Sequence, residues 1–157
     1  MSLRICLIVC AVLCVPAVTP ATAALTLTRQ VSPSLGTIYS GSSGRRFVLD
    51  TSGNVSGSGA GDYVSGAAAA VFQVEDDLSP SAITILAENL TSLGGVTVNQ
   101  VLCSYNGGTQ QKCDGTGISA TSISTATLRV GLDVTTAVTH TGGSTASVSM
   151  DISIAYE

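Results

Sequence analysis

The chain has 157 residues, of which only 10% are charged and 4% are aromatic, whereas soluble domains average about 25% charged residues. One lysine, one histidine and no tryptophan argue against most enzymes. They also argue against nucleic-acid binding, because a phosphate backbone would meet no basic patch. In contrast, 21 serines, 19 threonines and 17 glycines are typical of a surface protein rich in strands and turns.

The first 23 residues have the three parts of an export signal. Arg4 supplies positive charge, residues 5–15 form an apolar run, and Ala21-Thr22-Ala23 is a small-residue cleavage pattern. The run is too short to span a bilayer, which takes about 20 residues. We therefore predict a secretory signal peptide at 1–23. Residues 24–157 would form one exported domain without a membrane span, located in the periplasm, at the cell surface or outside the cell.

Export also determines which cysteines remain in the mature protein and whether they can form a disulfide. Cleavage removes three of the five and leaves Cys103 and Cys113 in an oxidising compartment. Asn106-Gly107, between them, is a strong hairpin signal because both residues tolerate positive φ. We predict a disulfide that staples a local hairpin rather than organising the fold. A zinc site is the alternative, but it needs four ligands and no histidine or further cysteine lies nearby.

Period-two alternation recurs along the mature chain, and helical periodicity does not. The clearest strand is 146–156. Its apolar face carries Val148, Met150, Ile152, Ile154 and Tyr156. Segment 125–134 alternates in the same way, and turn residues at 141–144 separate the two, so we predict that they pair as an antiparallel hairpin.

Turn residues separate six further strand candidates. These are 25–31, 35–39, 46–50, 69–75, 82–88 and 96–105. The glycine- and serine-rich stretch 53–66 is typical of a long loop or a weak edge strand. Without a helix to cover the apolar face of a sheet, that face must pack against a second sheet. We therefore predict an all-β, immunoglobulin-like antiparallel β-sandwich of about seven to eight strands.

No catalytic or metal-binding constellation stands out. His140 lies among turn residues without an identifiable carboxylate or serine partner, so we expect a surface histidine. Glu75-Asp76-Asp77 and the segment 50–54 hold carboxylates but lack the spacing of a calcium loop. We interpret both as turns whose carboxylates cap backbone amides, with calcium binding as the alternative. We predict no enzymatic activity, no cofactor and no metal.

The order of several short motifs resembles a known bacterial family. The motifs are Leu35-Gly36-Thr37-Ile38, Phe47-Val48-Leu49-Asp50, Ala70-Val71-Phe72-Gln73-Val74 and the closing Ile154-Ala155-Tyr156-Glu157. Together they resemble the family catalogued as domain of unknown function 4402. Such families are similar to the subunits of chaperone–usher pili, whose last strand also ends with a penultimate aromatic residue. The resemblance implies a structural subunit that self-associates into a fibre, with a periplasmic chaperone and an outer-membrane usher as partners.

The function that we predict is a pilus-like surface fibre subunit that assembles by β-strand addition. The candidate donor strand is 24–31, where Leu25, Leu27 and Val31 share one apolar face. Arg29 lies on the same face and must reach solvent or a carboxylate. The same segment is also consistent with the first strand of the domain itself. The alternative function is a secreted monomeric adhesion or binding module of the same fold, and an extracellular hydrolase is a distant third.

Overall fold

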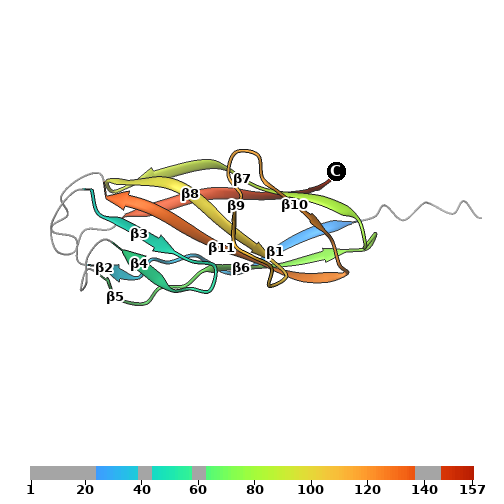
Figure 1. Cartoon of the computed structure of the whole chain (residues 1–157), viewed down its shortest axis with the longest axis horizontal. Coiled ribbons are helices and arrows are strands. Elements are labelled where there is room, and N and C mark those ends of the chain that lie inside the picture. The colour runs from blue at the N-terminus through green and yellow to red at the C-terminus, as the bar shows by residue number, and fades with distance from the viewer. Residues whose placement is uncertain (1–23, 39–43, 58–62, 137–145) are drawn as a thin grey trace, which may run out of the picture.

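A computed structural model describes residues 24–38, 44–57, 63–136 and 146–157. They form an antiparallel β-sandwich, which confirms the predicted fold class (Figure 1). Eight strands have four or more residues, and four further strands have two or three. Within the described residues there is no helix with the length and apolarity to cross a membrane.

The larger sheet is built around the long strand β11 (Thr125–Thr136). Its other strands are β1 (Leu25–Val31), β3 (Arg46–Leu49), β4 (Val55–Gly57), β6 (Ala70–Asp76), β8 (Val96–Tyr105) and β9 (Gln111–Lys112). β6 and β3 pair with successive parts of β11, and β8 pairs along nearly all of it. β1 extends the sheet beyond β6, β4 extends it beyond β3, and β9 extends it beyond β8.

The smaller sheet has the strand order β10–β7–β12. Its strands are β10 (Ile118–Thr121), β7 (Ala82–Leu93) and β12 (Ser147–Tyr156). The short strands β2 (Thr37–Ile38) and β5 (Tyr63–Ser65) pair with each other. The long strands of both sheets run along the long axis of the molecule, so the core lies between two elongated layers (Figure 1).

The predicted hairpin between the last two long strands is wrong. β11 pairs with β3, β6 and β8 in the larger sheet, whereas β12 pairs with β7 in the smaller one. Alternation identifies the face that a strand buries, and both sheets bury a face against the same core. The pattern therefore could not distinguish a hairpin from two strands facing each other across the sandwich. The proposed turn at 141–144 lies outside the described residues.

The core is mostly aliphatic, as the composition predicts. Its fully buried large side chains include Phe47, Val74, Ile83, Ile85, Val101, Leu128, Val130 and Val134. Sequence analysis missed β10, because Ile118–Thr121 is short and has one large apolar residue. The interpretation of 53–66 as a weak edge agrees with β4, a three-residue edge strand on β3.

Candidate functional site

The C-terminal strand β12 is an edge strand whose apolar face is half covered. It pairs with β7 on one side, and among the described residues no strand pairs with its other side. Of its five predicted inward residues, four pack against the core and are half-buried, namely Val148, Met150, Ile152 and Ile154. The fifth, Tyr156, is 37% exposed, so that part of the prediction is wrong. On β7, which has a neighbour on each side, Ile83 and Ile85 are fully buried. The difference follows from the position of β12 at the edge.

β1 is the corresponding edge of the larger sheet. It pairs antiparallel with β6 of the same chain, so within one chain this segment is the first strand of the domain. Leu25 and Leu27 are half-buried against the core, as their shared face predicts. Val31, by contrast, is 41% exposed. The register shifts between Arg29 and Val31, and this irregularity interrupts the alternation.

The two edges lie on the same flank of the sandwich. β1 and β12 contact each other, and Figure 1 shows β1 close to the C-terminal end of β12. We call the surface formed by β1 and β12 the open flank. Within the described part of the chain, each of these strands has one unpaired edge, which exposes main-chain N–H and C=O groups. The core side chains below are incompletely covered. An added strand could bind to both features. Its main chain would form hydrogen bonds with the unpaired edge, and its apolar side chains would fill the spaces between the incompletely covered core side chains.

The penultimate residue, Tyr156, ties β12 to the larger sheet. Its hydroxyl donates a hydrogen bond of 2.5 Å to Oδ1 of the buried Asp76 on β6, and the amide of Leu78 donates to the same oxygen at 2.8 Å. Burial raises the pKa of this carboxyl group, but hydrogen bonds from Ser122, Tyr156 and Leu78 outweigh burial and hold the pKa below its ordinary value. The bond to Asp76, together with burial and the charge of Asp77, raises the pKa of Tyr156 to about 12.

We expect Tyr156→Phe to remove the tyrosine that titrates near pH 12. An unfolded tyrosine has a pKa of about 10. Because the folded pKa is higher, the protonated hydroxyl stabilises the fold fully below that pH, and the contribution is lost as the pH rises from about 10 towards the folded pKa. Ultraviolet titration of the tyrosine phenolates measures whether the component with the highest pKa is lost. Tyr105→Phe, which should keep that component, is the matched control. A Tyr156→Phe protein that kept the highest-pH component would show that the hydrogen bond to Asp76 is wrongly assigned.

Cys103 and Cys113 form the predicted disulfide, with their Cα atoms 5.7 Å apart. Cys103 lies on β8, Cys113 directly follows β9, and these strands pair as an antiparallel hairpin. Asn106 and Gly107 both have positive φ, at 48° and 72°, as the hairpin signal requires. The disulfide and its hairpin are therefore confirmed.

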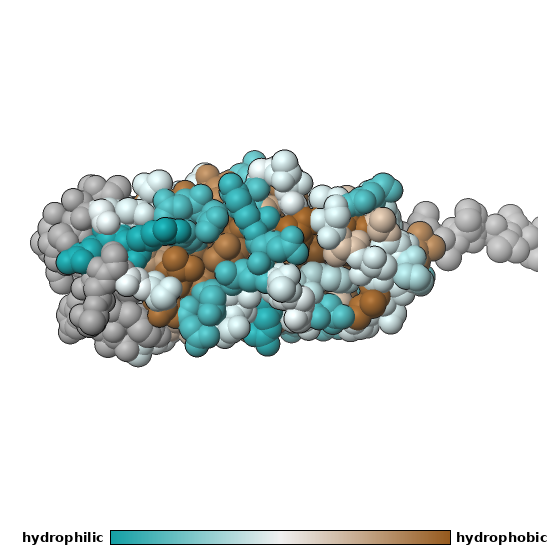
Figure 2. All heavy atoms as spheres, viewed as in Figure 1, coloured by the Kyte–Doolittle hydropathy of each residue, from teal (hydrophilic) through white to brown (hydrophobic). Residues whose placement is uncertain are grey.

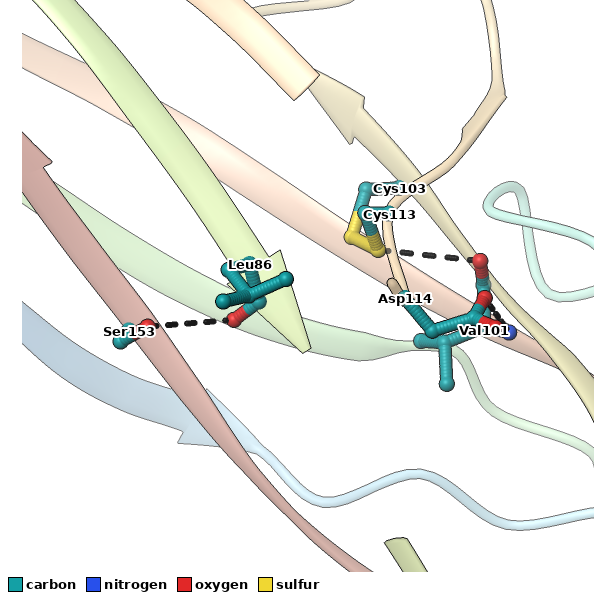
Figure 3. Close-up of a disulfide and its surroundings, with 6 residues drawn as sticks. All are labelled: Leu86, Val101, Cys103, Cys113, Asp114 and Ser153. Atoms are coloured by element: carbon teal, nitrogen blue, oxygen red, sulfur yellow. Dashed lines mark hydrogen bonds between the residues drawn. A yellow bond between two sulfur atoms is a disulfide. The ribbon is translucent and has the colours of Figure 1, made fainter. Parts of the chain in front are cut away.

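The disulfide also reaches the core between the sheets, which corrects the prediction of a purely local staple. Both cysteines are fully buried within the main core cluster. The carbonyl oxygen of Cys113 accepts a hydrogen bond from the amide of Ala87 on β7 at 2.9 Å. Asp114 Oδ1 accepts one from the amide of Val101 on β8 at 2.7 Å (Figure 3). The bridge thus lies where the chain after β9 contacts both sheets.

A fully buried carboxylate on the larger sheet escaped the sequence analysis. Asp133 on β11 receives hydrogen bonds from Nε and Nη2 of Arg46 on β3, at 2.9 and 2.5 Å. Asn99 and Gln100 on β8 donate to the same two oxygens at 2.9 and 3.2 Å. Chiefly through the bond from Arg46, the pKa of Asp133 is lowered despite burial. The four bonds satisfy the carboxylate and connect three strands, so this cluster is structural.

Asp50 and Asp76 are confirmed as amide caps, although Glu75 and Asp76 lie in strand β6 and not in a turn. Oδ1 of Asp50 accepts hydrogen bonds from the amides of Ser52 and Asn54, both at 2.8 Å. Asp76 caps Leu78 in the same manner. Among the described residues, no group of three or more His, Cys, Asp or Glu side chains is arranged for a metal ion, and His140 lies outside these residues.

Comparison with known proteins found no similar protein. No protein-family model matches the chain, and no curated protein or solved structure is significantly similar to it. The functional argument therefore depends on the residues themselves. Among the features described above, the open flank is the one that offers unpaired main-chain groups and uncovered apolar side chains together.

Proposed function

We propose that this chain is a structural subunit of a surface fibre, exported by its N-terminal segment and assembled by β-strand addition between subunits. The observation that carries the proposal is the open flank, where two strand edges are unpaired and the core is half covered. Proteins usually cover, shorten or charge such edges, because an open edge is a template for another strand.

In this proposal β1 is the donor strand. It has a single neighbour in its sheet, β6, so it can leave without displacing a second strand. In the next subunit it would pair with the vacated edge of β6 beside the apolar side chains of β12. Repeating this exchange head to tail gives an open fibre when the rotation between successive subunits does not close a ring.

The donor strand is held by modest apolar burial. Leu25 and Leu27 contribute at most about 3 to 6 kcal/mol, at roughly 1.5 to 3 for each fully buried leucine, reduced by the cost of ordering the strand. Arg29, which shares their predicted face, is exposed, so its charged end reaches solvent. A strand held this weakly can leave its own subunit and pair with the next one. Before assembly, a periplasmic chaperone and an outer-membrane usher would protect the open flank.

Deleting residues 24–31 is the experiment that tests the proposal. We expect the deletion variant to remain folded, to form no fibres alone, and to bind a synthetic peptide of residues 24–31 added in trans. Electron microscopy of the undeleted protein should show filaments, and fluorescence anisotropy measures peptide binding. The matched control peptide carries Leu25→Asp and Leu27→Asp, which removes the apolar face at the same length.

Two outcomes would contradict the proposal. If the deletion variant unfolds and the peptide does not restore it, the segment serves only its own domain and the donor mechanism is wrong. If the undeleted protein stays a monomer at every concentration and shows no filaments, the alternative is favoured, namely a secreted monomeric adhesion or binding module.

A further inference from the structure

A polar depression of 640 Å³ lies on the outer face of the larger sheet, away from the core. Three segments line it: the turn between β3 and β4, the end of β8 with the turn that follows it, and Arg129 on β11. In the view of Figure 2, hydrophilic and hydrophobic residues lie side by side across the middle of the molecule. None of the lining residues belongs to the open flank, so the depression is a separate feature of the surface.

Close backbone packing positions the first of these turns. The end of β3 crosses β11 at Gly131, where a Cβ atom would lie 2.2 Å from the carbonyl oxygen of Leu49 and 2.9 Å from the carbonyl carbon of Asp50. Any other residue would therefore push the turn away. The amide of Thr51 donates a hydrogen bond of 2.8 Å to Oε1 of Gln110, which fastens this turn to the segment before β9.

The depression contains one guanidinium group, Arg129, and one carboxylate, Asp50, which form no ion pair with each other among the described residues. Both oxygens of Asp50 accept hydrogen bonds from their own turn, from Ser52 and Asn54. The side chain of Arg129 on β11 is exposed, and among the described residues this side chain forms no ion pair or hydrogen bond. The amide oxygen of Gln110 is occupied, which leaves its NH₂ group free to donate. The lining is thus rich in donors around a single guanidinium group.

We propose that this depression binds an acidic monosaccharide unit, a polyhydroxylated ring that carries one carboxylate. The carboxylate pairs with Arg129, whose planar fork fits two carboxylate oxygens. The ring hydroxyls bond to the hydroxyl groups of Thr51 and Ser52 and to the Gln110 amide. The volume suits a sugar, since small-molecule sites measure about 300 to 1,000 Å³. The lining has no large apolar side chain, which disfavours an apolar ligand.

Titration of the isotope-labelled protein with glucuronate, followed by amide chemical shifts, tests this assignment. We expect saturable binding that Arg129→Gln weakens by about tenfold or more, as for a charged hydrogen-bonded pair. Arg29→Gln, which changes the charge equally outside the depression, should bind like the wild type. Glucose, which lacks the carboxylate, and acetate, which lacks the ring, should both bind at least about tenfold more weakly than glucuronate.

A second variant keeps the test independent of any folding defect in the first. Ser52 is an exposed turn residue, and Ser52→Asp places a negative charge at the rim, so it should also weaken glucuronate binding. The proposal is overturned if the wild type shows no saturable shifts, or if both depression variants bind as tightly as Arg29→Gln. Equal affinity for glucose would overturn the carboxylate contact, and equal affinity for acetate would overturn recognition of the sugar. Fibre formation is not read in this experiment, so its result is separate from that of the proposed function.

Discussion

Replacing Cys103 and Cys113 together with alanine is expected to lower the free energy of unfolding by about 2 to 5 kcal/mol. The bridge spans ten positions, and closing a loop of this size restricts the unfolded chain by about 3 kcal/mol on the chain-entropy model. The two sulfur atoms also fill space in the core, because both cysteines are fully buried. Urea denaturation of the variant and the wild type measures the loss.

The reduced wild type separates the two causes of this loss. Reduction removes the covalent bond but keeps both sulfur atoms, so it should cost less stability than the double alanine variant. Mass spectrometry under non-reducing conditions should find no free thiol at Cys103 or Cys113 in the oxidised protein. Equal urea midpoints for the oxidised and reduced wild type would contradict a stabilising bridge.

Asp133→Asn is expected to lower the free energy of unfolding by about 2 kcal/mol at neutral pH, the scale of a hydrogen bond to a charged group. The carboxylate is fully buried and receives four hydrogen bonds, and an amide can accept through only one of its two terminal atoms. Loss of a fully buried ion pair partner would cost more, about 3 to 5 kcal/mol. The side chain of Arg46 is 59% exposed, however, so water solvates its charge once the pair is broken.

The same substitution is expected to reduce the acid sensitivity of the fold. The pKa of Asp133 is lowered in the folded protein, whereas an unfolded aspartate has a pKa of about 3.9. The ionised carboxylate therefore stabilises the fold above that pH, and this contribution is lost as the pH falls towards the folded pKa. Asp50 and Asp76 also have lowered pKa values, so part of the acid sensitivity should remain.

Asp77→Asn is the matched control, because it removes one carboxylate from an exposed turn. Urea denaturation at neutral and acid pH compares the three proteins. If the Asp133→Asn and Asp77→Asn variants lose stability equally with acid, the Asp133 cluster does not stabilise the fold in the way that its geometry indicates.

Local signals in the sequence were sufficient for the longer strands, for two turns and for the disulfide, whereas the short strand β10 was missed. Alternation located β1, β8 and β12 to within one residue at each end. Asn106-Gly107 marked the turn between β8 and β9, and the amide caps Asp50 and Asp76 were identified from residue type. Each of these features depends on residues close together in the chain, where backbone preference and side-chain alternation act directly.

Tertiary structure alone decided which strands became neighbours and where the surface features formed. Arg46 and Asp133 are 87 positions apart, and the lining of the depression comes from three separate segments. The open flank depends on β12 having a neighbour on one side only, although its sequence alternates as it would in the centre of a sheet. A period of two reports the face that a strand buries and carries no information about its partner. Pairing is chosen by long-range register and by the paths of the connections, so the flank, the Asp133 cluster and the depression exist only in the folded chain.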